Sequence, residues 1–288
     1  FHSSGTSYIS HNGSGQLQIR AKSSEQGIKI FPDGAVELYH NNNRKIFTTS
    51  TGVQISCDPD GDGLKFEGTT RRIDLVANTN RSGATNTILE LDAHWNNTSV
   101  AFIALATGDD TTNKDDGRLR FFTKPSGGSI AERLRIEPDG QVVFGGAGSR
   151  NVGFTHRLQI EDTNDTPHGF SMISNRANIY GPHMSFAKSR GSTRGSVNIV
   201  QANDELATIL FRGADGTDIN TTAAQIDVRV DGTPGSNHIP GSFEFYTRNA
   251  ASQLAKRLVI NSSGHLMPGA DSTYNIGSSS VRFANVYA

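Results

Sequence analysis

The sequence predicts a mainly β protein, and three observations support this fold class. Apolar and polar residues alternate with a period of two along almost the whole chain, as in strands that bury one face. Gly accounts for 31 of 288 residues and hydrophobic residues for only 34%, a composition that favours short strands and polar turns over helices. Turn signals such as Pro32-Asp33-Gly34 and Pro138-Asp139-Gly140 separate the alternating runs.

The alternating runs define the expected strands in chain order. The clearest are 17–21, 36–38, 53–57, 119–123, 158–160, 226–230 and 243–247. Their intervening residues are mostly Gln, Arg, Lys, Glu and Asp, so we expect one dry face and one solvated face. The segment 249–259 contains helix-forming residues, but its counterpart in the repeat described next contains Pro125, Gly127 and Gly128, which argue against a helix.

An internal repeat is the strongest sign of how the chain is organised. A shift of 124 residues aligns 100–145 with 224–269 without a gap, and a shift of 121 aligns 87–89 with 208–210. The hairpin 28–36 also resembles 134–142. The predicted regions are a hairpin shaft over 1–70, a β module over 71–150, a second module over 151–270 that repeats the first, and a tail over 271–288.

The N-terminal hairpins are too short to be stable alone. Hairpins with one apolar face bury too little surface to offset the loss of chain entropy, and residues 1–70 lack the apolar content for a core of their own. Packing each hairpin against the same hairpin of other copies solves this problem. We therefore expect an elongated homotrimeric fibre of short hairpins followed by two related β modules.

Composition excludes several other classes of protein. The net charge is -1, from 27 Lys and Arg against 28 Asp and Glu, which argues against a nucleic-acid partner. The longest apolar run, 100–106, is far shorter than the roughly 18 residues of a membrane helix. The single cysteine, Cys57, excludes an intrachain disulfide, and no signal-peptide pattern indicates export by the usual route.

One segment has the pattern of a calcium loop. Asp58, Asp60 and Asp62 alternate before Gly63, which matches the oxygen-rich half of such a loop. The position of the bidentate glutamate in a helical calcium hand is occupied by Thr69, which excludes that type of site. A looser calcium-binding turn and a plain acidic hairpin turn both remain, and no other cofactor is expected.

No catalytic constellation emerges from the sequence, so we do not expect an enzyme. The acidic pairs 109–110 and 115–116 have the residue type that a glycosidase needs. Their repeat counterparts are Thr233-Pro234 and Ile239-Pro240, which favours solvated loop charges. The basic residues Lys188, Arg190 and Arg194 form either an anion-attracting patch or a solvated loop.

Aromatic side chains in polar loops are the best candidates for receptor binding. A flat ring stacks on the apolar face of a sugar while neighbouring amides and carboxylates bind its hydroxyls. Trp95 lies between His94 and Asn96, and Tyr180 and His183 flank Gly181-Pro182. Packing and subunit interfaces are the alternative roles for Trp95, Tyr180 and His183.

Three groups of segments resemble bacteriophage tail fibres. Residues 33–53 are similar to repeats of such fibres, and 184–191, 209–217 and 224–226 to a segment found in phage tail proteins. Residues 271–288 resemble the stretch before the self-cleaving intramolecular chaperone domain of tail fibres and tailspikes. The resemblance implies a trimeric adhesin whose chaperone domain, which contains the cleaving serine, is absent from this chain.

The expected function follows from this resemblance and from the predicted fibre. We expect a structural and host-receptor-binding tail-fibre protein that is made in the host cytoplasm, joins other tail proteins in the virion, and attaches to a bacterial surface glycan or outer-membrane protein. The alternatives are a tailspike-type polysaccharide depolymerase, which would release reducing ends, and a purely structural shaft, which would not compete for adsorption.

Overall fold

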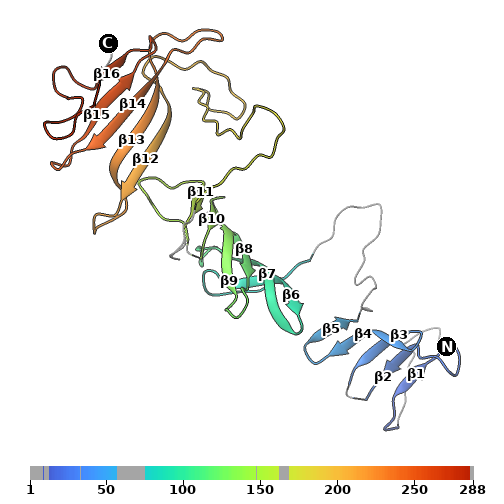
Figure 1. Ribbon diagram of the computed structural model, residues 1–288. Helices are drawn as coiled ribbons and strands as arrows, with labels where there is room; N and C mark the ends of the chain where they lie inside the picture. The colour runs from blue at the N-terminus through green and yellow to red at the C-terminus, as the bar shows by residue number, and fades with distance from the viewer. Residues whose placement is uncertain are drawn as a thin grey trace. The chain divides into compact units, whose positions relative to one another are not determined.

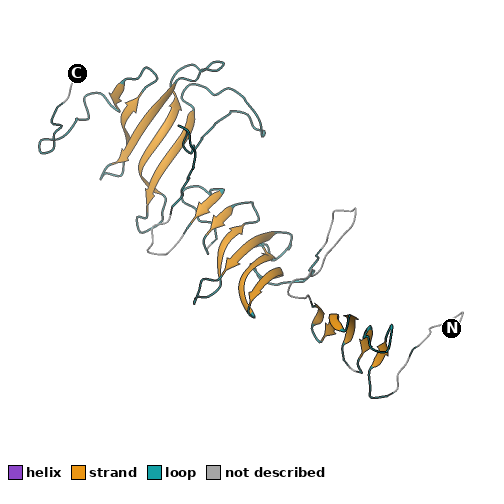
Figure 2. Ribbon diagram, turned by 45° about the vertical axis from the view of Figure 1, so that its right-hand side comes forward, coloured by secondary structure: helices purple, strands orange, loops and turns teal. Residues whose placement is uncertain are grey.

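The computed structural model describes residues 9, 13–32, 34–56, 75–146, 148–161 and 169–285. Every regular element among them is a β-strand, which confirms the mainly β class and the prediction against a helix over 249–259. The strands form three sheets (Figures 1 and 2). The chain divides into two compact units, residues 1–76 with the first sheet and 77–288 with the other two. Within the described ranges, no helix has the length and apolarity needed to span a bilayer.

The first sheet is an antiparallel meander. Its strands are β1 (Leu17–Ile19), β2 (Ile28–Ile30), β3 (Val36–His40), β4 (Asn43–Thr49) and β5 (Gly52–Ile55). Asn41 and Asn42, with φ of 49° and 61°, form the tight turn between β3 and β4. The register places one aliphatic residue from each strand in a single row across the sheet: Ile19, Ile28, Leu38, Ile46 and Ile55.

The second sheet has six strands in the order β11-β10-β9-β8-β7-β6. They are β6 (Thr87–Trp95), β7 (Thr98–Thr107), β8 (Gly117–Thr123), β9 (Ala131–Ile136), β10 (Val142–Phe144) and β11 (Leu158–Ile160). Only the pair β10 and β11 is parallel within this sheet. An apolar row again crosses every strand: Leu91, Ile103, Phe121, Leu134, Phe144 and Ile160.

The third sheet is an antiparallel meander of five strands. They are β12 (Glu205–Gly213), β13 (Thr221–Val230), β14 (Gly241–Arg248), β15 (Leu254–Ile260) and β16 (Leu266–Pro268). Its central apolar row is Ile209, Ile226, Phe245, Leu258 and Pro268.

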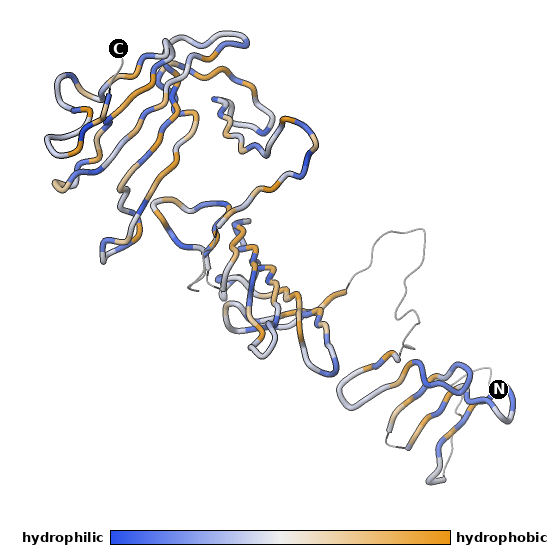
Figure 3. Tube along the Cα trace, in the orientation of Figure 1, coloured by the Kyte–Doolittle hydropathy of each residue, from blue (hydrophilic) through white to orange (hydrophobic). Residues whose placement is uncertain are grey.

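The apolar faces of the sheets have no partner among the described strands, because each strand contacts only strands of its own sheet. Ile209 is 45% exposed and Leu158 is 55% exposed, although both belong to apolar faces. Figure 3 shows the alternation of hydrophobic and hydrophilic residues along the strands. Among the described residues, more polar than apolar side chains are buried, and the buried apolar ones are only Ala and Val. The dry face expected from the alternation is therefore open in the single chain.

The second and third sheets repeat one pattern, with a change of register that the sequence alignment missed. Phe245 lies 124 residues after Phe121, whereas its partner Ile226 lies 123 residues after Ile103. The extra residue is in the connection between β13 and β14, residues 231–240, against 108–116 between β7 and β8. The gap-free alignment therefore holds from β8 onward and is wrong by one residue for β7.

The first strand of the repeat is displaced further. Ile209 faces Ile226 as Leu91 faces Ile103, so β12 follows β6 at a distance of 118 residues. The predicted match of 87–89 with 208–210 at a shift of 121 is therefore wrong. The same three residue types begin β6 and recur in the middle of β12, and this identity suggested the match, although their cross-strand partners differ.

Candidate functional site

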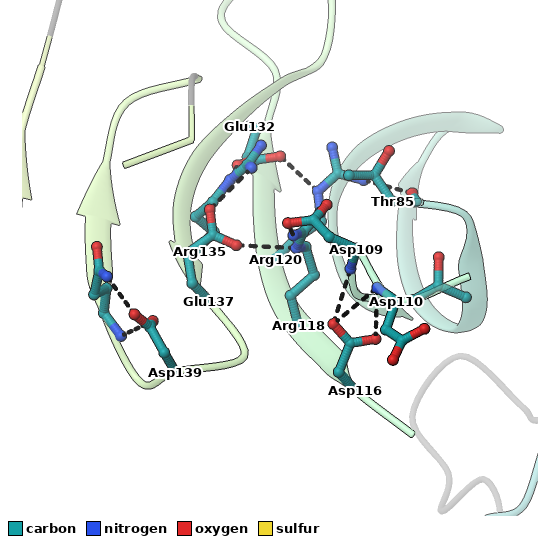
Figure 4. Close-up of polar contacts among 12 residues, drawn as sticks. Thr85, Asp109, Asp110, Asp116, Arg118, Arg120, Glu132, Arg135, Glu137 and Asp139 are labelled. Atoms are coloured by element: carbon teal, nitrogen blue, oxygen red, sulfur yellow. Dashed lines mark hydrogen bonds and ion pairs between the residues drawn. The ribbon is translucent and has the colours of Figure 1, made fainter. Parts of the chain in front are cut away.

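The polar face of the second sheet carries a continuous chain of ion pairs (Figure 4). We call its six residues, Asp109, Arg118, Arg120, Glu132, Arg135 and Glu137, the charged row. Glu132 Oε2 lies 2.6 Å from Arg120 Nε, and its other oxygen binds Arg135. Glu137 lies 3.3 Å from Arg135 Nη1 and 3.0 Å from Arg118 Nε. Arg118 Nη2 completes the row at 2.9 Å from Asp109 Oδ2.

The sheet register explains why the charges alternate along this row. Arg120 on β8 lies directly opposite Arg135 on β9, and two like charges at that spacing repel each other. Glu132 lies between them and binds one guanidinium with each of its two carboxylate oxygens. Desolvation lowers the pKa of the Arg135 guanidinium, but the hydrogen bonds and charges of Glu132 and Glu137 outweigh it, so that the pKa is raised. Acidic and basic side chains therefore alternate along all six residues of the row.

Asp116 shapes the loop between β7 and β8 that borders the charged row. Its carboxylate accepts the backbone N–H of Asp109 at 2.9 Å and that of Asp110 at 3.3 Å. A side chain at Gly108 would collide with this carboxylate and displace it from the backbone N–H groups that it binds. The two acidic pairs were predicted to be solvated loop charges. Instead, Asp109 pairs with Arg118, and Asp116 stabilises the loop through its backbone hydrogen bonds.

A cleft of about 500 Å³ opens where this loop meets the turn between β9 and β10. Its walls include Asp116, Arg118, Glu137, Asp139 and Gln141. Asp139 accepts the backbone N–H of Gln141 at 3.1 Å and binds its side-chain amide, and the backbone bond is the main cause of the lowered pKa of Asp139. Gln141 is only 6% exposed, and its Oε1 has no hydrogen-bond partner.

The third sheet has a different polar face at the equivalent positions. Asp227 is fully buried and accepts hydrogen bonds from Thr208 Oγ1 at 2.9 Å and Gln225 Nε2 at 2.6 Å. The pair Arg120–Glu132 is replaced by Glu244–Lys256, 3.0 Å apart, which keeps the ion pair and reverses its polarity. Each module thus has its own electrostatic pattern on a shared strand scaffold.

Trp95 lies at the tip of the β6–β7 hairpin. Asn96 and Asn97 have φ of 48° and 60°, the left-handed pair that a two-residue turn requires, and Trp95 faces Thr98 across it. Trp95 is 79% exposed. Since β7 runs from this tip to the loop at Gly108, Trp95 lies at the opposite end of the hairpin from the cleft.

The side chains next to Trp95 form a small hydrogen-bonded cluster. Asp92 accepts from Ser99 Oγ at 2.7 Å, and its other oxygen lies 2.7 Å from His94 Nε2. The bond from Ser99 is the main cause of the lowered pKa of Asp92. Because the carboxylate, and not the imidazole, is shared, the arrangement differs from that of an activated serine nucleophile.

The other predicted candidates lie apart from the cleft. Tyr180 and His183 are exposed in the irregular segment between β11 and β12, and the backbone N–H of Tyr180 is bound by Asn178 Oδ1 at 3.1 Å. Neither residue lines the cleft. The calcium candidates Asp58, Asp60 and Asp62 lie outside the described residues. In the parts of the chain that the structure describes, no three His, Cys, Asp or Glu side chains could hold a metal ion.

The basic segment near residue 190 is paired internally. Arg190 donates to both carboxylate oxygens of Asp204, at 2.7 and 2.8 Å, and Lys188 Nζ lies 3.8 Å from the same group. The hydrogen bond from Arg190 is the largest cause of the strongly lowered pKa of Asp204. Neither the anion-attracting patch nor the fully solvated loop describes Lys188 and Arg190, since both are close to this buried carboxylate.

Sequence reasoning missed the charged row because of a β-bulge. The register shifts by one residue between Phe121 and Phe122, so Glu132 and Arg135 lie on the same face although three positions separate them. A strict period of two places them on opposite faces. The available signal was the density of opposite charges in 117–123 and 131–137, which becomes informative only when the bulge is known.

Comparison with solved structures identifies a similar fold. The carboxy-terminal domain of the bacteriophage T5 L-shaped tail fibre, determined with its intramolecular chaperone domain, matches with a TM-score of 0.61 and 17% identity, over 82% of this chain and 66% of that one. The structure of the carboxy-terminal domain of the same fibre matches with a TM-score of 0.57 and 18% identity, over 81% of this chain and 96% of that one. No protein-family model and no curated protein sequence matches the chain. The chain has the fold of a phage tail-fibre domain.

Proposed function

We propose that this chain is a non-enzymatic segment of a phage tail fibre, present in the virion with other tail proteins, that assembles as a homotrimer and attaches the particle to a bacterial surface. The observation that carries the proposal is the unpartnered apolar face of all three sheets. A sheet normally buries such a face against a second layer. The similarity of the fold to the carboxy-terminal domain of a tail fibre supports the same conclusion.

Three copies around an axis give each apolar face a partner. Three flat sheets can close into a triangular prism with their apolar faces inward and their polar faces outward. Burying one Leu, Ile, Val or Phe side chain contributes roughly 1.5–3 kcal/mol, and each sheet presents at least one row of such residues. In the trimer the charged faces point to the solvent, where receptor contacts form.

Attachment would rely on several weak contacts acting together. Three equivalent sites on each fibre, and several fibres on each particle, raise the effective concentration of the remaining sites once the first is occupied. Trp95, Tyr180 and His183 remain candidates for such contacts, since all three are exposed. The target is a glycan or an outer-membrane protein of the bacterial surface.

Adsorption competition with the purified chain tests this function. We expect the chain to sediment as a trimer at micromolar concentration and to reduce adsorption of the parent virus to its host in a dose-dependent manner. A compact monomer would contradict the assembly, and undiminished adsorption would contradict host attachment and favour a structural shaft. Release of reducing ends from host polysaccharide would contradict the non-enzymatic role.

A further inference from the structure

We propose that the cleft beside the charged row binds a neutral, hydroxyl-rich glycan. The proposal rests on the proposed function, because it assigns a ligand class and a place to the attachment. The cleft measures about 500 Å³, within the range of small-molecule binding sites. Its walls come from three turns of one module, which contribute Asp109 and Asp116, residues 137–141, and Gly148 with Ser149. Thr85 and the strand residues Arg118 and Arg135 complete the lining.

The third sheet serves as an internal control for the purpose of these charges. From β8 onward the two modules correspond at a shift of 124 residues, so Arg118, Arg135 and Glu137 correspond to Ser242, Val259 and Asn261. The same strand scaffold therefore folds without this part of the charged row. Removing charged groups from water costs free energy that their pairing only partly returns. The strand scaffold does not need these charges in order to fold, and we therefore assign them to ligand binding.

The cleft also contains a buried acceptor without a donor. Gln141 is 94% buried, since only 6% of it is exposed, and its amide group donates to Asp139. The carbonyl oxygen of the same amide is buried and accepts nothing, an arrangement that costs stability. This oxygen has almost no exposed surface, so a rotation of the Gln141 side chain toward the cleft would let a ligand hydroxyl supply the missing donor.

The charges that line the cleft select the class of ligand. Four carboxylates, those of Asp109, Asp116, Glu137 and Asp139, face two guanidinium groups, those of Arg118 and Arg135. Arg157, whose guanidinium donates to the backbone carbonyl of Asp139, offsets one of these charges, and the acidic excess that remains disfavours phosphorylated, sulfated and carboxylated sugars. Carboxylate and amide oxygens accept hydrogen bonds from hydroxyl groups, while the guanidinium groups donate to hydroxyl and ring oxygens. A neutral saccharide with adjacent hydroxyl groups can use both types of partner.

Binding to a glycan array tests the proposal. The probes are neutral hexose oligosaccharides together with sulfated and sialylated counterparts of the same chains. We expect the labelled protein to bind neutral members at least tenfold more strongly than the anionic ones. Absence of binding to every neutral probe, or preference for the anionic ones, would overturn the proposal.

Variants that introduce the equivalent residues of the third sheet test whether the glycan binds in the cleft. Arg118→Ser together with Glu137→Asn removes both members of one ion pair and introduces the residues that the repeat carries at these positions. Gln141→His introduces the residue that the repeat carries at this position, His265, and removes the buried amide acceptor without removing a charge. We expect each variant to sediment like the parent protein and to lose at least tenfold in neutral-glycan binding. Unchanged binding in both variants would refute the cleft as the site.

A matched control separates this proposal from the proposed function. Lys22→Ser with Glu25→Asn removes an ion pair of 3.1 Å that lies outside the cleft, and it should leave glycan binding unchanged. If the cleft variants bind glycans and block adsorption as well as the parent protein does, host attachment stands and the cleft assignment fails. If the parent protein itself does not block adsorption, the proposed function fails.

Discussion

Individual carboxylates determine the shapes of several loops in this protein. Asp116, Asp204 and Asp215 each accept backbone N–H groups of nearby residues, which replaces the hydrogen bonds that irregular backbone lacks. The sequence indicates that such residues lie in turns, but not which groups they bind, because their partners depend on the conformation of the loop. The prediction of solvated loop charges was therefore incomplete for Asp109, which pairs with Arg118, and for Asp116, which binds backbone N–H groups.

Asp215 gives a testable consequence at this scale. The hydroxyl of Thr221, followed by the N–H groups of Thr217 and Asp218, lowers its pKa to about 2. Since this value lies below the ordinary 3.8, the ionised group stabilises the fold above about pH 4, and the contribution is lost as the pH falls toward 2. Because water screens so exposed a group, we expect Asp215→Asn to lower the melting temperature at pH 7, at one fixed heating rate, by less than about 2 °C.

Melting curves recorded between pH 1 and 7 measure this effect. The difference between Asp215→Asn and the parent protein should shrink as the pH falls from about 4 through 2 and disappear about one pH unit below 2. Asp115→Asn, at an exposed loop position, is the control and should have no effect at any pH. A difference for Asp215→Asn that is as large at pH 1 as at pH 7 would show that its carboxylate does not act through ionisation.

At the scale of strands and turns, the sequence predicts element type better than register. Alternation and turn residues correctly indicate the strands around 36–38, 119–123 and 243–247, because they depend on local geometry. Register depends on the lengths of the connections and on bulges, which leave little local signal. The displaced repeat alignment and the missed charged row both have this origin.

Phe243 on β14 tests whether the open apolar face is an interface. It is 50% exposed in the single chain and faces Val228 and Ile260 on the neighbouring strands. If three copies cover this face, Phe243→Glu loses roughly 1.5–3 kcal/mol of burial per chain and places a charge in the interface. We expect a marked loss of trimer in sedimentation. His265→Glu, in the exposed turn of the same sheet, should leave the trimer intact, and equal behaviour of the two variants would contradict the interface.

At the scale of the whole molecule, the single chain buries charged side chains and exposes large apolar ones, which is the opposite of an ordinary globular domain. Arg118, Asp227 and Glu244 are buried while Leu158, Ile209 and Phe243 are exposed. Long charged side chains lie over one face of a sheet and shield one another, as in the charged row. In the proposed trimer, the opposite faces are buried only when other copies cover them. Folding and assembly are therefore expected to be a single event.

Coupled folding and assembly predicts kinetic rather than equilibrium control of stability. Unfolding one chain would expose apolar rows on three sheets of its neighbours at the same time, so the barrier should be high and the measured melting temperature should rise with the heating rate. In the proposed trimer, refolding requires the encounter of three chains and should slow markedly on dilution.

We expect an unheated sample to migrate as a trimer in SDS electrophoresis and a boiled sample as a monomer. Differential scanning calorimetry at several heating rates, with refolding yields measured over a hundredfold range of concentration, provides the test. A melting temperature independent of heating rate, together with refolding independent of concentration, would mean that each chain folds alone and that the apolar faces have another purpose.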